Sequence, residues 1–101
     1  MADLRAQIEN EIKSGKVVIY SKSKCPYCVK VKQLFDSLNV QFKAIELDQL
    51  ENGAALQQAL SEKTGKRTVP QVFINEKLIG GCDDTMAKNE SGELALLLKD
   101  N

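Results

Sequence analysis

The chain has no histidine, no tryptophan and only three cysteines among its 101 residues. A structural zinc site normally uses four cysteine or histidine ligands, so it would need carboxylates or a partner chain here, and we expect no metal. The formal net charge is zero, which argues against nucleic acid as a partner because nucleic-acid-binding proteins usually carry a basic excess. No apolar run is long enough for a membrane-spanning helix, so we expect no membrane partner. The chemistry of the protein should therefore depend on cysteine.

The size and apolar content predict one domain spanning residues 1–101. The chain is close to the usual size of a single domain, and 43% of its residues are apolar, which is enough for a buried core. No charged-then-apolar leader begins the sequence, and three cysteines cannot all pair, so a secreted disulfide framework is disfavoured. We therefore expect a reducing compartment, the cytoplasm, where closely spaced cysteines are usually catalytic or metal-binding.

Apolar periodicity predicts an α/β fold in which helices and strands alternate. The expected elements, in chain order, are a helix over 4–12, a strand over 16–20, a helix over 26–38, a strand over 40–47, a helix around 55–60, strands over 71–75 and 77–81, and a helix over 83–100. A helical crossover joins the first two strands, so they should be parallel. The last two strands should form a hairpin around Asn75 and Glu76.

Some positions within these elements carry finer expectations. Gly15 suits the left-handed position just past the end of the first helix, and Gly65 should close the third. The final helix should break near Ser91 and Gly92. The second strand should alternate through the apolar residues Phe42, Ala44 and, less regularly, Ile45 and Leu47. In the third helix, we expect the apolar face to consist of Ala55, Leu56, Ala59 and Leu60.

The segment "SKSKCPYCVK" places two cysteines two residues apart between a strand and a helix. A purely structural disulfide is a poor explanation, because such a small loop removes little entropy from the unfolded chain. Electron exchange fits better. Cys25 would be the N-cap of the helix, with Pro26 at its first position, so that free backbone N–H groups and the helix dipole stabilise a thiolate. Cys28, one turn later, faces the buried stripe and should remain a thiol.

Six lysines precede any interrupting acid in this part of the chain, and they predict a positive patch around the cysteine pair: Lys13, Lys16, Lys22, Lys24, Lys30 and Lys32. Cationic neighbours and a helix N-terminus lower the pKa of a cysteine from about 8.5 to roughly 3.5–7.5. We therefore expect Cys25 to be the attacking cysteine and Cys28 to be the resolving one. Alternatively, these lysines could form an ordinary solvated surface that has no role in the chemistry of the cysteines.

Three blocks resemble the glutaredoxin family: "CPYC" at 25–28, "TVPQVFI" at 68–74 and "GGCDD" at 80–84. The resemblance covers nearly the whole chain. It implies a thioredoxin-like α/β fold, with a four-stranded mixed sheet flanked by helices and an extra N-terminal helix. It also implies glutathione as co-substrate. Thioredoxins are less similar, because they place Gly-Pro between their cysteines after a tryptophan, and this chain has no tryptophan.

The resemblance further implies a glutathione-binding groove. The glycyl carboxylate of glutathione would meet Lys22, Gln57 and Arg67. The cysteinyl part of glutathione would pair with the backbone of Val69, next to a cis Val69–Pro70 bond. The remaining implied contacts are Tyr27, Thr68 and Pro70 along the peptide, and Gly81, Cys82, Asp83 and Asp84 at the γ-glutamyl end. Simpler readings stay open: a solvated Gln57, a glycine pair that only exits the hairpin, and acids that cap the final helix. We expect Cys82 to be a small buried residue, and the alternative is an exposed thiol that becomes glutathionylated or links two chains.

The expected function is that of a glutathione-dependent thiol–disulfide oxidoreductase acting as a monomer. Cys25 alone would reduce glutathionylated proteins, and Cys25 with Cys28, through a redox-active disulfide between them, would reduce disulfide-containing proteins. An alternative is an iron–sulfur binding module ligated by the first cysteine and glutathione, which is associated with glycine or serine where this chain has Pro26. Another is a thioredoxin-like enzyme served by a reductase.

Overall fold

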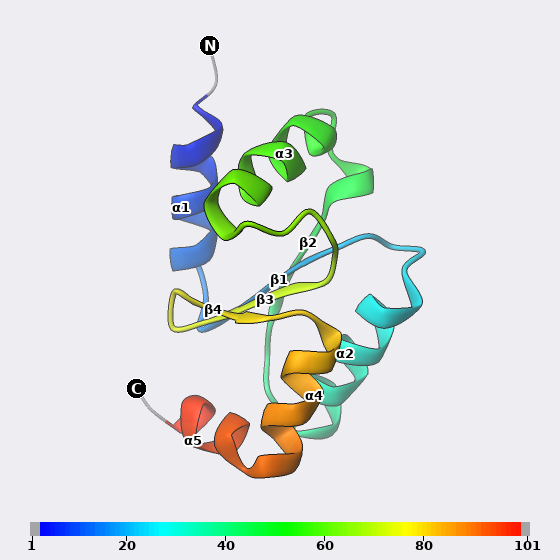
Figure 1. Cartoon of the computed structure of the whole chain (residues 1–101), viewed down its shortest axis with the longest axis vertical. Helices are drawn as coiled ribbons and strands as arrows, with labels where there is room; N and C mark the ends of the chain where they lie inside the picture. Colours follow the sequence, from blue (N-terminus) through cyan, green and yellow to red (C-terminus); the bar gives the residue numbers. More distant parts are fainter. Residues whose placement is uncertain (1–2, 100–101) are drawn as a thin grey trace.

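A four-stranded mixed sheet organises the residues that the structure describes, 3–99 of this computed structural model (Figure 1). The strands are β1 (Val17–Ser21), β2 (Lys43–Glu46), β3 (Gln71–Ile74) and β4 (Lys77–Gly80), in the order β2-β1-β3-β4. As predicted, β1 and β2 are parallel, and β3 and β4 form an antiparallel hairpin. The predicted turn residues Asn75 and Glu76 both have positive φ, of 51° and 70°. The expected ends of the domain at residues 1–2 and 100–101 lie outside the described residues.

Helices cover both faces of this sheet (Figure 1). They are α1 (Leu4–Lys13), α2 (Pro26–Ser37), the short 3₁₀ helix η1 (Leu47–Gln49), α3 (Gly53–Thr64), α4 (Cys82–Ser91) and α5 (Glu93–Lys99). Helices α1 and α3 pack on one face, and α2, α4 and α5 pack on the other. The predicted mixed sheet flanked by helices, with an additional helix at the N-terminal end, is therefore confirmed. No helix within residues 3–99 is long and apolar enough to span a membrane.

The core consists of two clusters, one on each side of the sheet, because successive residues of a strand point to opposite faces. Val18 and Tyr20 of β1 belong to the cluster under α1 and α3, whereas Val17 and Ile19 belong to the cluster under α2, α4 and α5. The Tyr20 hydroxyl donates to a carboxylate oxygen of Glu11 on α1 at 2.7 Å, which satisfies the one polar atom of an otherwise buried ring.

The second strand is shorter than predicted. Residues 40–42 lie outside it, because Asn39 adopts a positive φ of 58° and the Val40 N–H donates to the Phe35 carbonyl at 3.0 Å. The chain thus folds back onto the end of α2, and the ring of Phe42 packs near that of Phe35, with centroids 6.2 Å apart. Ala44 is exposed, which contradicts the expected inward face, and the buried residues here are Ile45 and Leu47.

The helices decide the remaining finer expectations, some of which are corrected and some confirmed. Ala55 is exposed and only Leu56 and Leu60 of the predicted face are fully buried, because the helix presents a narrower stripe to the sheet. Gly15 has no positive φ, since α1 already ends at Ser14 in a right-handed conformation. Gly65 and Gly92 do adopt the left-handed conformation, and Gly92 separates α4 from α5 at the predicted break.

Replacing Gly53 by alanine should destabilise the fold. A Cβ at this buried first residue of α3 would lie 1.8 Å from the Leu47 carbonyl oxygen, so η1 and α3 would have to separate. We expect Gly53→Ala to lower the free energy of unfolding by about 2 kcal/mol, and the melting temperature by roughly 10 °C, in a thermal or urea titration. Gly15→Ala is the matched control, because its Cβ would meet nothing closer than 3.7 Å. Equal stability of the two variants would contradict this packing.

Candidate active site

Cys25 occupies the N-cap of α2, as the sequence predicted. Its backbone is extended, with φ −95° and ψ 113°, and Pro26 begins the helix. The Sγ atom accepts a hydrogen bond from the Cys28 N–H at 3.3 Å. A first-turn N–H that normally lacks a partner is therefore directed at the sulfur, and the positive end of the helix dipole adds to the same field. Cys25 is partly exposed, so a substrate can reach it.

Cys28 is fully buried and is a free thiol, as expected for a residue on the inner stripe of α2. Burial, and next to it the hydrogen bond with Cys25, raise the pKa of the Cys28 thiol to about 11. The two cysteines thus have different environments. Cys25 faces the surface with a donor on its sulfur, whereas Cys28 is held neutral behind it.

The loop from β1 to Cys25 is tied to η1 by an acidic side chain, Asp48, that the sequence did not predict. The Asp48 carboxylate accepts from the Ser23 N–H at 3.1 Å and also from the Ser23 hydroxyl. These hydrogen bonds from Ser23 lower the pKa of Asp48. One residue beyond β1, the Lys22 carbonyl accepts the Cys25 N–H at 3.1 Å, which closes the turn that places the sulfur.

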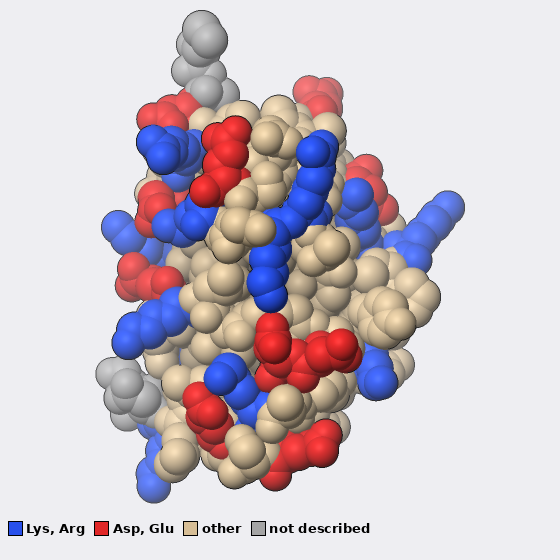
Figure 2. Space-filling model, viewed as in Figure 1, with Lys and Arg blue, Asp and Glu red and all other residues tan. Residues whose placement is uncertain are grey.

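The cationic patch is narrower than predicted. Lys32 pairs with Glu46 at 2.5 Å, and Lys16 donates to the Leu98 carbonyl at the opposite end of β1 from the cysteines. Lys22, Lys24 and Lys30 remain in the segment around the cysteine pair. Figure 2 shows basic and acidic side chains interspersed over one face of the molecule rather than a uniformly basic surface. In the sequence no acidic residue interrupts this run of lysines, but in the fold Glu46 of β2 and Asp48 of η1 lie close to the segment around the cysteine pair.

The loop before β3 meets the nucleophile. Val69–Pro70 is a cis peptide bond, as the resemblance implied. The Val69 carbonyl oxygen lies 3.9 Å from the Cys25 Sγ. Val69 belongs to no helix or strand, and among residues 3–99 no hydrogen bond to its N–H is found. This backbone is therefore positioned beside the sulfur and is free to pair with an extended ligand.

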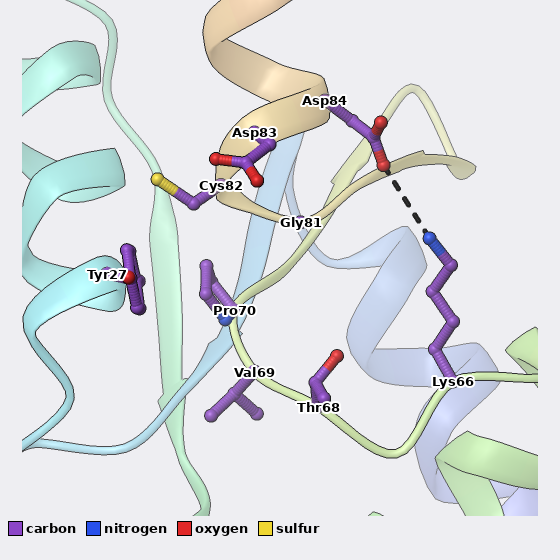
Figure 3. A pocket seen from close by; sticks show the side chains of 9 residues that line it. All are labelled: Tyr27, Lys66, Thr68, Val69, Pro70, Gly81, Cys82, Asp83 and Asp84. Atoms are coloured by element: carbon purple, nitrogen blue, oxygen red, sulfur yellow. Dashed lines mark ion pairs between the residues drawn. The ribbon is translucent and has the colours of Figure 1, made fainter.

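An open cleft of about 400 Å³ lies between this loop, the first turn of α2 and the start of α4 (Figure 3). Cys25 does not line it but adjoins it, because its Sγ lies 3.9 Å from the carbonyl oxygen of the lining residue Val69. Eight of the predicted glutathione contacts line it: Tyr27, Thr68, Val69, Pro70, Gly81, Cys82, Asp83 and Asp84. Lys66 also lines it and was not predicted. A lysine two residues before the Thr-Val-Pro block carries no signal of its own, because only the fold shows that this loop turns toward α4.

The other three predicted contacts do not line the cleft. Lys22 is half-buried in the turn before Cys25, and Arg67 is exposed on the loop before β3. The side-chain amide of Gln57 donates to the Arg67 carbonyl at 2.7 Å, so this glutamine is engaged with protein rather than simply solvated. Whether these residues reach a glycyl carboxylate stays a prediction.

The start of α4 differs from the expected cap. The helix begins at Cys82, its N-cap is Gly81, and no side chain caps it. Asp83 and Asp84 therefore stand inside the first turn, which leaves the first backbone N–H groups of α4 facing the cleft without a side-chain partner. Gly80 is required here, because its φ is 132° and a Cβ would lie 2.4 Å from a carboxylate oxygen of Asp84.

Two further features complete the cleft. Lys66 and Asp84 form an ion pair of 3.6 Å across it, which joins the loop before β3 to α4 (Figure 3). Cys82 is buried, with 7% of its surface exposed, and packs into the core cluster under α2 and α4. Of the two readings left open for Cys82, the structure supports the small buried residue, although its side chain also lines the cleft.

The arrangement is suited to thiol–disulfide exchange. A partly exposed sulfur with an N–H donor stands at the edge of a cleft, and a second thiol lies one turn away, behind it. The cleft offers unpaired backbone N–H groups at a helix start, which bind carboxylates well, and an exposed lysine on the opposite side. A small anionic peptide disulfide is the kind of ligand that such groups select.

Comparison with known proteins gives one consistent family. The family model described as glutaredoxin matches residues 17–79. The chain is 58% identical to glutaredoxin-C6 of Oryza sativa subsp. japonica over 93 residues, which are 92% of this chain and 83% of the rice protein. It superposes on a crystal structure of wheat glutaredoxin with a TM-score of 0.92 at 55% identity, covering 94% of this chain and 90% of that one. A buckwheat glutaredoxin–glutathione complex also matches, with a TM-score of 0.92 at 45% identity, covering 94% and 86%.

Iodoacetamide at pH 7 should alkylate Cys25 before the other two cysteines. Only the thiolate reacts; burial raises the pKa of Cys82, and the pKa of Cys28 is raised to about 11, so both remain protonated at neutral pH. Peptide mass spectrometry after timed quenching gives the order of modification. Raising the pH from 7 toward 11 should increase the modification of Cys28, because its thiolate fraction grows as the pH approaches its pKa. Equal labelling of Cys25 and Cys28 at pH 7 would contradict the assignment.

Proposed function

The chain belongs to the glutaredoxin family of glutathione-dependent thiol–disulfide oxidoreductases, which have a thioredoxin-like fold, and from this premise we propose that it reduces protein–glutathione mixed disulfides with Cys25 and protein disulfides with Cys25 and Cys28. The single observation that carries the proposal is the Cys25 sulfur. It accepts a helix N-terminal N–H and adjoins a cleft lined by the predicted glutathione contacts.

In the first route, Cys25 acts alone. Its thiolate attacks the glutathione sulfur of a glutathionylated protein, so that a Cys25–glutathione disulfide forms and the protein thiolate leaves. The N–H of Cys28 stabilises the charge on Cys25 before the attack and again when the sulfur is released. A second glutathione thiolate then attacks the sulfur of the bound glutathione. This step returns Cys25 as a thiolate and releases oxidised glutathione, one half of which comes from the mixed disulfide, so one glutathione thiol is consumed for each mixed disulfide reduced.

In the second route, Cys28 resolves the intermediate. Cys25 attacks a protein disulfide and becomes linked to one sulfur of the protein. Cys28 then loses its proton and attacks Cys25, which releases the protein thiol and forms a Cys25–Cys28 disulfide that two glutathiones reduce. Burial raises the pKa of Cys28 in the reduced protein, and Cys25 adds to this rise. The attack is aided by the position of Cys28 one helical turn from Cys25, which holds the two residues next to each other before the reaction.

Glutathione would lie across the cleft with its sulfur at Cys25. Its cysteinyl part would pair with the Val69 backbone, which is free and adjacent to the nucleophile. The γ-glutamyl carboxylate would meet the N–H groups of Cys82 and Asp83 in the first turn of α4, where backbone donors lack side-chain caps. The buckwheat relative was solved as a complex with glutathione, which supports the same ligand here.

The finer parts of the proposal concern partners and setting. The protein substrates would be glutathionylated and disulfide-containing proteins, and the enzyme would act as a monomer. The cytoplasm is the proposed location, since the cycle consumes glutathione and regenerates free thiols. The iron–sulfur alternative gains no support from the contacts among residues 3–99.

Replacing Cys28 by serine should separate the two routes. Cys28→Ser retains a backbone N–H toward Cys25, so reduction of a glutathionylated peptide should persist within about threefold, whereas reduction of a protein disulfide should fall by about a hundredfold or more because the resolving thiol is absent. Both rates can be followed in a glutathione-coupled assay.

Cys25→Ser is the control for this experiment, because it should abolish both activities. If Cys28→Ser kept both activities, or lost both, the division of roles between the two cysteines would be wrong. A wild-type protein that worked only with a thioredoxin reductase as electron donor would overturn the glutathione dependence itself.

A further inference from the structure

Two glutamine side chains hold three successive carbonyl groups of the loop before β3. The side-chain amide of Gln71 donates to the carbonyls of Lys66 and Thr68, at 2.8 and 3.0 Å. The side-chain amide of Gln57 donates to the carbonyl between them, that of Arg67, at 2.7 Å. The two glutamines come from different elements, β3 and α3. The loop is thus attached to both, although it forms neither helix nor strand.

Gln71 is placed unusually for an amide side chain. It is only 2% exposed, and its Oε1 is a buried polar atom with no hydrogen-bond partner among residues 3–99. A buried acceptor without a partner costs free energy, so an apolar residue of similar shape would suit the core better at this strand position. What such a residue would lack is the pair of N–H donors. The buried amide is therefore explained by its two bonds to the loop.

The loop that these bonds hold supplies one wall of the cleft. Lys66, Thr68 and Val69 all line it, and the Val69 carbonyl lies 3.9 Å from the Cys25 Sγ (Figure 3). A segment without helix or strand bonds would otherwise sample many backbone conformations, and a ligand would have to order it on binding. Fixing three successive carbonyls leaves a single loop conformation before the ligand arrives, which removes that cost.

We propose that Gln71 is a positioning residue, which orders residues 66–69 for the glutathionyl part of the substrate, with Gln57 as its second point of attachment. This inference rests on the proposed function, because it assumes that glutathione lies along this loop. Gln71 touches neither the sulfur nor the cleft, so its effect is on binding. It leaves the reactivity of Cys25 itself unchanged.

A merely structural role would have a different signature. The Lys66 carbonyl also accepts from the Thr64 hydroxyl at 3.2 Å, so it keeps a partner if the glutamine is replaced. An apolar side chain of the same length would also remove the unpartnered oxygen. Stability should therefore change little, while the order of the loop should fall. Binding and folding are separable at this position.

The test is Gln71→Met, an unbranched replacement that fills the same space without donors. We expect KM for a glutathionylated peptide to rise by about tenfold with kcat within about twofold, because the substrate must then order the loop as it binds, which costs conformational entropy. Trypsin should cut after Lys66 and Arg67 faster than in the wild-type protein, because cleavage needs a segment that can open from its attachments, and the rate of Cys25 alkylation by iodoacetamide should not change. Gln58→Met is the matched control, because Gln58 donates only to Glu62 on the exposed side of α3, at 3.4 Å.

The outcomes distinguish the positioning role from the proposed function. A raised KM together with faster tryptic cleavage at Lys66 and Arg67, for Gln71→Met and not for Gln58→Met, supports the positioning role. Unchanged KM and cleavage overturn it, as does a loss of melting temperature with unchanged KM, which would make Gln71 a folding residue only. If the wild-type protein showed no glutathione turnover, the proposed function would fail, and unchanged cleavage in Gln71→Met would then overturn the ordering of the loop as well.

Discussion

The hydrogen bond from the Cys28 N–H to the Cys25 sulfur is the contact on which the site depends. It exists because β1 ends at Ser21 and α2 begins at Pro26, so only a short turn separates a buried strand from the free N–H groups of a helix. Pro26 fixes where the helix starts, and Cys25 then has to be the N-cap. The same turn of helix directs Cys28 inward, where burial holds it as a thiol. One local constraint thus gives two identical side chains different environments.

Everything else at the site is brought to this sulfur by the sheet. The order β2-β1-β3-β4 places the loop before β3 and the start of α4 beside the end of β1, although these segments are far apart in the chain. Polar contacts from neighbouring elements hold the turn before the nucleophile, through Asp48, and the loop that carries Val69, through two glutamine amides. The cleft is consequently a meeting of several restrained loops on a rigid support, which is the usual way for a fold to present reactive groups.

The conformational preferences of single residues predicted the features that depend only on neighbouring residues in the chain. The strand–turn–helix junction at Cys25, the left-handed Gly65 and the hairpin turn at Asn75 follow from residue preferences, and the structure confirms them. The cis Val69–Pro70 bond came from the family resemblance alone, because most X–Pro bonds are trans. Most of the cleft lining also came from the resemblance, since its members are distant in the chain.

The failures have two physical causes. Alanine is too small to report which face is buried, so Ala44 and Ala55 were placed inside although both are exposed. Contacts between segments carry no signature in a single sequence either. Lys66 in the cleft and Asp48 behind the turn act through side-chain contacts that depend on how separate loops approach one another. The edges of the sheet have a consequence of a different kind. Strands β2 and β4 are its two borders, each has only four residues, and each starts with a lysine, Lys43 or Lys77. Short edge strands that carry charge offer few backbone groups for pairing with a strand of another molecule, so edge-to-edge association of two copies is disfavoured, even at high protein concentration.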